Sequence, residues 1–179
     1  KAVRLRDDPV ARRERERSRT GAGGDDLLFG AAGADALVGG LGTDTASYVG
    51  SAAVNVNLAT NVATGGDAAG DTFSSVENLI GSSNNDTLTG DGAANNVDGG
   101  AGADAMAGGA GDDTFIVDDA GDTASENASE GTDTVRSAVT FVLGANIENL
   151  VLTGVANVNG TGNALANTLT GNAGNNVLD

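Results

Sequence analysis

The sequence predicts an all-β fold: a flattened, right-handed parallel β-roll, a β-solenoid in which short strands stack in successive turns. Three observations lead to it. The 179 residues include 29 glycines but only 4 phenylalanines, 1 tyrosine and no tryptophan, which excludes a core built on aromatic side chains. Aspartate or asparagine, followed by an apolar residue, recurs with a nine-residue period. Strand-like β-branched runs fill the spacers between the repeats. A thin solenoid that buries small side chains satisfies all three.

The charge of the chain restricts its partners. It carries 25 acidic and 9 basic residues, a formal net charge of -16. We therefore expect no nucleic-acid partner, whereas divalent cations are suitable ligands. The chain lacks histidine and cysteine, which removes the usual general base and the commonest zinc ligands. No apolar run approaches the roughly 18 residues of a membrane-spanning helix, so we expect no membrane insertion.

The N-terminal segment, residues 1–20, differs from the rest. It holds eight of the nine basic residues and four of the 25 acidic residues. It has no apolar face, so we expect a basic linker or a poorly structured segment. The alternative is that these arginines dock on an acidic neighbour or polyanion.

The first repeat cluster spans residues 21–47 and contains three nonapeptides. Its sixth places hold aspartate and its eighth places hold apolar residues. The sixth-place residues are Asp26, Asp35 and Asp44, and the eighth-place residues are Leu28, Leu37 and Ala46. We expect each nonapeptide to form a six-residue loop and a three-residue strand, with the eighth side chain in a narrow core.

The second repeat cluster spans residues 81–122 and keeps the same register. Its sixth places are Asp86, Asn95, Asp104 and Asp113, and its eighth places are Leu88, Val97, Met106 and Phe115. A degraded loop, VDDAGD, closes the cluster at Asp122. We expect Asp112, Asp118 and Asp119 to be surface turn residues.

Two β spacers, residues 48–80 and 123–159, separate the clusters. The first contains AAVNVNLAT, whose alternation predicts a strand. Each spacer ends in a related pentapeptide, VENLI or IENLV, interpreted as a strand with a buried apolar edge. A binding role for their glutamates, Glu77 and Glu148, is the less favoured alternative. Residues 160–179 are truncated repeats with Asn167 and Asn176 at the sixth places.

Glycine and aspartate at this spacing indicate calcium. The tight loops need backbone angles that glycine adopts easily, and they aim carbonyl oxygens into the gap between stacked loops. Sixth-place aspartates from adjacent turns bring two negative charges into the same gap. Calcium takes six to eight hard oxygen ligands at about 2.3–2.6 Å, while magnesium demands a stricter octahedron and fits less well.

The units GGAGADAMA and GGAGDDTFI resemble the RTX (repeats-in-toxin) nonapeptide, the hemolysin-type calcium-binding repeat, Gly-Gly-x-Gly-x-Asp-x-apolar-x. The resemblance is most specific at 21–47 and 81–116 and weaker at 160–179. RTX proteins are bacterial, typically leave the cell by type I secretion, and form calcium-loaded parallel β-rolls. The resemblance implies several calcium ions, each held between two loops that lie one turn apart by loop carbonyls and the two sixth-place aspartates.

Transferred to this chain, that pattern gives three sites. The best pairs Asp86 with Asp104, and the carbonyl donors are Ser82, Asn84, Gly99 and Ala101, with Gly100 and Gly102 as further candidates. A second pairs Asp26 with Asp44, and the carbonyl donors are Ala22, Gly24, Gly39 and Leu41. A third pairs Asn95 with Asp113, and the carbonyl donors are Gly108 and Ala110. The third site has one carboxylate, so we expect it to bind more weakly.

The remaining sixth places are less regular. Asp122 is expected to face Asp104 from the degraded loop. Asp35 is a candidate ligand without a good partner, because the segment one turn later has no aspartate at the sixth place. At Asn167 and Asn176 we expect hydrogen bonds between turns rather than an ion.

The function that follows is a calcium-binding structural β-roll segment of a secreted bacterial RTX protein, which folds on calcium outside the cell or at its surface. We expect no enzyme activity, since the chain has no Gly-x-Ser-x-Gly elbow, HExxH helix or P-loop. Two alternatives stay open. One is a non-catalytic secretion or polysaccharide-binding module of a secreted enzyme, such as an alginate epimerase, lipase or protease. The other is a surface-layer, adhesin or matrix protein that binds copies of itself.

Overall fold

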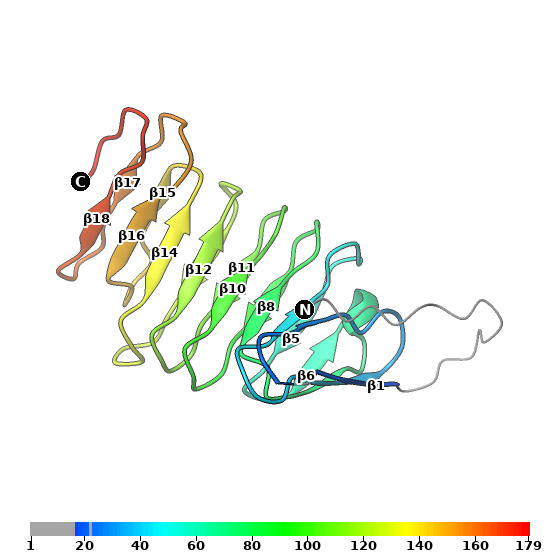
Figure 1. Cartoon of the computed structure of the whole chain (residues 1–179). Helices are drawn as coiled ribbons and strands as arrows, with labels where there is room; N and C mark the ends of the chain where they lie inside the picture. Colours follow the sequence, from blue (N-terminus) through cyan, green and yellow to red (C-terminus); the bar gives the residue numbers. More distant parts are fainter. Residues whose placement is uncertain (1–16, 22) are drawn as a thin grey trace.

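The computed structural model describes residues 17–21 and 23–179. Short strands stack in layers along the molecule, from β2 and β3 near one end to β18 at the other (Figure 1). No helix of the described residues is long and apolar enough to cross a membrane. The strands are β1 (Arg17–Thr20), β2 (Leu27–Leu28), β3 (Asp35–Val38), β4 (Thr45–Ser47), β5 (Asn55–Asn57), β6 (Val62–Thr64), β7 (Thr72–Ser74), β8 (Asn78–Ile80), β9 (Thr87–Thr89), β10 (Asn96–Asp98), β11 (Ala105–Ala107), β12 (Thr114–Val117), β13 (Thr123–Ser125), β14 (Thr134–Ser137), β15 (Phe141–Val142), β16 (Asn149–Leu152), β17 (Gly160–Thr161) and β18 (Thr168–Thr170).

The strands form two sides of a solenoid. One side is an eight-stranded sheet, the long sheet, in the order β18-β16-β14-β12-β10-β8-β4-β2. The other side consists of three shorter sheets, β1-β3-β7, β13-β11-β9-β5-β6 and β15-β17. Apart from the antiparallel pair β5–β6, the described strand pairs are parallel. The predicted all-β parallel solenoid is therefore confirmed.

Eighth-place side chains fill the space between the two sides. In the first two clusters these residues are at most 2% exposed: Leu28, Leu37, Ala46, Leu88, Val97, Met106 and Phe115. They stack in register from turn to turn, as Val97 does on Phe115 across β10 and β12. In the last cluster Leu169 is partly buried, and Leu178 is 42% exposed. The predicted core is thus confirmed in the two clusters that carry the regular repeats.

The first spacer forms an excursion on one side of the solenoid. In the long sheet β4 pairs directly with β8, so 33 residues separate equivalent positions instead of the usual 18. On the other side β5 pairs with β9, while β7 pairs with β3. In the sequence, the antiparallel strand β6 and one 3-10 turn, η1 (Gly66–Ala68), lie between β5 and β7. Val54, Val56 and Leu58 alternate into the core as predicted.

The second spacer stays closer to the regular turn. Equivalent positions are 20 residues apart between β12 and β14, and 15 residues apart between β14 and β16. Val135 and Leu150 take the core positions and are fully buried. The pentapeptides VENLI and IENLV thus supply β8 and β16 to the same long sheet, which confirms that they are strands with a buried edge.

Five of the loops have a glycine with a left-handed backbone angle at the fourth place. The φ angles there lie between 99° and 127°, in a region that side chains with a Cβ rarely adopt. These residues are Gly24, Gly33, Gly42, Gly102 and Gly111.

The residues of the predicted N-terminal linker before β1 lie outside the described part of the chain, and β1 itself pairs with β3.

Candidate metal centre

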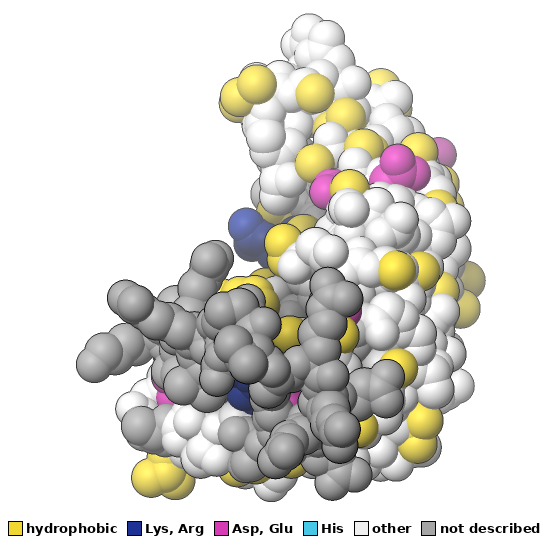
Figure 2. Space-filling view, turned by 90° about the vertical axis from the view of Figure 1, so that its right-hand side faces the viewer, with side chains coloured by type: hydrophobic (Ala, Val, Ile, Leu, Met, Phe, Trp, Pro, Cys, Tyr) yellow, Lys and Arg dark blue, Asp and Glu magenta, His cyan; other side chains and the backbone are white. Residues whose placement is uncertain are grey.

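Acidic side chains line both flanks of the solenoid, where the loops enter the strands. One column directly precedes the strands of the long sheet and consists of Asp26, Asp44, Glu77, Asn95, Asp113, Asp133, Glu148 and Asn167. The second column stands at the entry to strands of the other side and consists of Asp35, Asp71, Asp86, Asp104 and Asp122. All aspartates of the two columns are at most 7% exposed. Figure 2 accordingly shows few acidic side chains on the face turned to the viewer, although the chain is strongly acidic.

The carboxylates form a hydrogen-bonded ladder along each flank. Nine of the carboxylates accept, through one oxygen, the backbone N–H of the equivalent residue one turn earlier, over 2.6–2.9 Å. On the flank of the long sheet, the bonds run from the donor to the acceptor as follows: Asp26 to Asp44, Asp44 to Glu77, Asn95 to Asp113, Asp113 to Asp133, and Asp133 to Glu148. On the other flank they run from Asp35 to Asp71, Val54 to Asp86, Asp86 to Asp104, and Asp104 to Asp122. These bonds fix the carboxylates between the turns.

The other carboxylate oxygen is unsatisfied at several ladder positions. The Oδ2 atoms of Asp44, Asp104, Asp113 and Asp133 are buried and have no hydrogen-bond partner. A buried charged oxygen without a partner is costly unless it is paired or coordinates a metal. The residues present therefore fit a hard cation, and carboxylate and carbonyl oxygens are the ligands that calcium prefers.

The first-place glycines let sixth-place carboxylates and the backbone of the next turn approach closely, because a Cβ there would meet both. A Cβ on Gly81 would meet Asp86 Oδ2 and the carbonyl oxygen of Gly99 from the next turn. A Cβ on Gly21 would likewise meet Asp26 Oδ2 and the carbonyl oxygen of Gly39. At both glycines, a sixth-place carboxylate lies close to the first-place carbonyl one turn later, as the sequence predicts for its two best sites.

The other predicted ligands are placed as follows. The carbonyl oxygens of Ser82, Asn84 and Gly24 face the glycine at the same loop position one turn later. Those glycines are Gly100, Gly102 and Gly42. The carbonyl of Gly108 faces Gly90 beside Asn95 Oδ1, and the carbonyl of Leu41 accepts the N–H of Gly24 at 2.6 Å. Ala101 and Ala110 are exposed in the third places of their loops. Ala22 lies outside the described residues.

Burial raises the pKa of several carboxyls on the flanks. The pKa of Asp104 and of Asp113 rises from 3.8 to about 6, and that of Glu126, beside the column, rises from 4.5 to about 7. Burial is the largest cause, and the backbone N–H groups that these carboxylates accept oppose it only in part. Neighbouring carboxylates add to the rise. The flanks thus concentrate negative charge that a divalent cation would neutralise.

Asparagine changes this arrangement at three sixth places. Its side-chain amide donates to a backbone carbonyl of the preceding turn: Asn95 to Glu77 at 2.7 Å, Asn167 to Ile147 at 2.9 Å and Asn176 to Val158 at 2.6 Å. The side-chain oxygen accepts an N–H of its own loop. The expected ion-free hydrogen bonds of Asn167 and Asn176 are therefore present, and they run to the backbone of the neighbouring turn.

A known family of repeats matches the regular loops of this chain. The RTX calcium-binding nonapeptide repeat matches in four copies, over residues 20–46, 80–115 and 161–179. The chain contains RTX calcium-binding nonapeptide repeats. None of the curated proteins matches the chain. The RTX match confirms the predicted resemblance, and the repeat that it describes is a calcium-binding one.

Several ladder residues lie outside the matched RTX repeats and were missed or disfavoured from the sequence. Asp71, Glu77, Asp133 and Glu148 occupy the same columns as the sixth-place aspartates. A signal for them exists, since each stands two residues before an apolar residue that packs in or against the core: Phe73, Leu79, Val135 and Leu150. The sixth-to-eighth spacing of the RTX unit therefore persists where the glycines are lost.

The expectation that Asp35 lacks a good partner is wrong. The first spacer carries β7, rather than β5, next to β3, so the neighbour of Asp35 is Asp71, 36 residues later. Asp71 Oδ1 accepts the N–H of Asp35 at 2.8 Å, and its Oδ2 accepts the hydroxyl of Tyr48 at 3.0 Å. The sequence prediction assumes that equivalent residues lie 18 positions apart. It misses this pair because the first spacer inserts extra strands on one side of the solenoid, so the two residues are 36 positions apart.

Proposed function

We propose that this chain is the calcium-dependent β-roll segment of a secreted bacterial protein, kept unfolded at cytosolic calcium and folded by calcium outside the cell. The observation that carries the proposal is the set of buried carboxylate oxygens without partners on the two flanks, at Asp44, Asp104, Asp113 and Asp133. In this proposal Asp86 with Asp104, and Asp26 with Asp44, bind ions between their turns.

The contributions to the free energy of folding favour a chain that folds only when its ligand is bound. The interior is a narrow stack of eighth-place and spacer side chains, and 29 glycines must be ordered to build it. Without cations, conformational entropy and the repulsion between stacked carboxylates oppose folding. With calcium, binding free energy becomes folding free energy. Extracellular calcium modules have dissociation constants of about 10⁻⁴–10⁻³ M, far above cytosolic calcium levels.

Circular dichroism of the full chain tests this proposal. In the presence of a chelator we expect the spectrum of an unfolded chain, and on addition of millimolar calcium we expect a cooperative change to a β spectrum. Magnesium at the same concentration is the control and should leave most of the chain unfolded, because its octahedral geometry is stricter. A β spectrum that is the same with chelator and with calcium would show that calcium does not drive folding.

A further inference from the structure

A loop of the second spacer places a third carboxylate beside the ladder. Glu126 directly follows β13, and the loop then runs to Asp133 at the start of β14. The step from Asp113 to Asp133 is 20 residues rather than 18, so this turn is longer than a regular one. The side chain of Asn146 donates to the carbonyl of Glu126 at 2.9 Å, which fixes the start of the loop.

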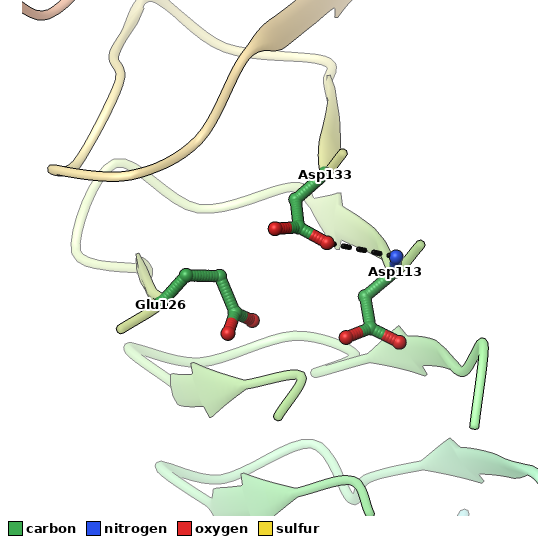
Figure 3. A group of neighbouring side chains, drawn as sticks. All are labelled: Asp113, Glu126 and Asp133. Carbon is green, nitrogen blue, oxygen red and sulfur yellow. Dashed lines mark hydrogen bonds between the residues drawn. The ribbon is translucent and has the colours of Figure 1, made fainter. Parts of the chain in front are cut away.

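Asp113, Glu126 and Asp133 direct their carboxylates into one space (Figure 3). One oxygen from each lies within 4.8 Å of the others. Asp113 and Asp133 are each 1% exposed, and their Oδ2 atoms have no hydrogen-bond partner. Their Oδ1 atoms are already held by the N–H groups of Asn95 and Asp113. Two buried oxygens are thus fixed in place and unsatisfied at the same point.

Glu126 is held in this position by the loop of the last regular nonapeptide. Its two oxygens accept the N–H groups of Gly108, at 2.5 Å, and Gly109, at 3.2 Å. Each oxygen keeps a second lone pair that can bind a cation. A Cβ on Gly108 would meet both Asp113 Oδ2 and Glu126 Oε1, so glycine at this place leaves the space between them open.

No basic side chain of the described residues pairs with these carboxylates. Arg136 is the one basic residue after residue 20, and its side chain is exposed on β14. In the described part of the chain, the hydrogen bonds that the three carboxylates accept come from backbone N–H groups. A hollow of about 250 Å³, lined by Glu126, Gly109 and Glu130 among others, opens beside Glu126.

We propose that Asp113, Glu126 and Asp133 form a three-carboxylate calcium site that is tighter than the two-carboxylate sites of the regular repeats. The affinity of an oxygen-ligand calcium site rises with the number of charged ligands. The sequence alone ranks the site at Asp113 as the weakest, because it pairs Asp113 with Asn95. The bound ion would fasten the second spacer to the last regular nonapeptide, and this inference rests on the proposed calcium-dependent folding.

Calcium titration by isothermal calorimetry on the full chain tests the site. Glu126→Gln keeps the size of the side chain but removes its charge, and we expect the tightest class of sites to weaken at least about tenfold. Asp119→Asn is the matched control, because it removes one charge from an exposed loop residue outside the cluster and keeps the side-chain oxygen that accepts the N–H of Gly121, and it should bind as the unmodified chain does. Equal affinities for the Glu126→Gln and unmodified chains would overturn the inference.

Hydrogen exchange on the unmodified chain decides the question if Glu126→Gln fails to fold. At calcium concentrations that fill only the tightest sites, amides of residues 108–113 and 126–133 should be protected before those of residues 82–104. Protection of 82–104 at the same or lower calcium would refute the three-carboxylate site alone. If the unmodified chain binds no calcium at all, the proposed function fails as well, so the two failures are distinguishable.

Discussion

The choice between aspartate and asparagine at a sixth place determines what fills the gap between two turns. Asp44 and Asp104 leave one buried oxygen without a partner, whereas Asn167 and Asn176 fill the same gap with an amide that donates to a backbone carbonyl. An amide carries its own donors and needs no ion, but a carboxylate has acceptors alone. Under the proposed function, the two residue types therefore distinguish turns that need an ion from turns that do not.

Asn167→Asp should convert an ion-free turn into one that needs calcium. The variant loses the amide bonds to the carbonyls of Ile147 and Glu148 and places a carboxylate beside them. We expect one additional bound ion per chain and a higher calcium concentration at the midpoint of folding, measured by calorimetry and circular dichroism. Asn157→Asp is the control, since Asn157 is exposed and uses only its side-chain oxygen, which aspartate keeps. An unchanged ion count in Asn167→Asp would contradict the prediction.

Gly81→Ala should weaken the site formed by Asp86 and Asp104. The new Cβ would meet the carbonyl oxygen of Gly99 and lie 2.6 Å from Asp86 Oδ2. Displacing these groups should raise the calcium concentration at the midpoint of folding about tenfold. Gly92→Ala is the control, because its Cβ meets nothing within 4 Å, and it should leave the midpoint unchanged or lower it. Equal midpoints for the two variants would show that the space beside Gly81 has no role in binding.

At the scale of the strand, in-register stacking of eighth-place side chains supplies the apolar contacts. Phe115 on β12 lies between Val97 on β10 and Val135 on β14, and all three are fully buried. Each strand has only two to four residues, so it contributes one or two side chains to the core. Loss of one large side chain therefore affects the contact with both neighbouring turns.

Phe115→Ala should destabilise the calcium-loaded protein by about 3–5 kcal/mol, because a narrow core cannot close around the cavity. Denaturant unfolding at saturating calcium measures this. The control Val142→Ala removes methyl groups from a side chain that is 62% exposed on β15, and it should change the free energy of unfolding by no more than about 0.5 kcal/mol. A loss below 1 kcal/mol in Phe115→Ala would mean that apolar stacking contributes little beside the ions.

The regular strands could be predicted from the sequence because one nine-residue period fixes both the core and the ladder. Asp86 and Asp104 follow this rule and lie together as expected. The spacers could not be placed in this way. The excursion before β8 pairs Asp35 with Asp71, and the longer turn before β14 brings Glu126 to Asp113. Both contacts depend on the lengths and paths of irregular loops, which no local pattern encodes.

Over the whole molecule, burial of like charges makes folding depend on what neutralises them. The chain has a formal net charge of -16, and its basic residues are concentrated in the first 20 positions. The ladder carboxylates of the two flanks repel one another along the length of the solenoid. Calcium neutralises this charge by coordination, and protons neutralise it by titration, so the two ligands compete for the same oxygens.

Acidic pH should therefore replace calcium in part. The pKa of Asp104 and of Asp113 is about 6 in the folded chain against 3.8 for the free group, and that of Glu126 is about 7 against 4.5. Because these pKa values are raised, the calcium-free fold gains stability from protonation below the unfolded values and loses it as the pH rises to about 7.

Circular dichroism in chelator should thus show more β structure near pH 4 than at pH 8. As the pH falls from 7 to 5, the folding midpoint should also move to a lower calcium concentration, because protonation of the folded chain already supplies part of the stability that calcium supplies at pH 7. A calcium-free chain that gains no structure on acidification would show that repulsion between the flanking carboxylates is not what keeps it unfolded.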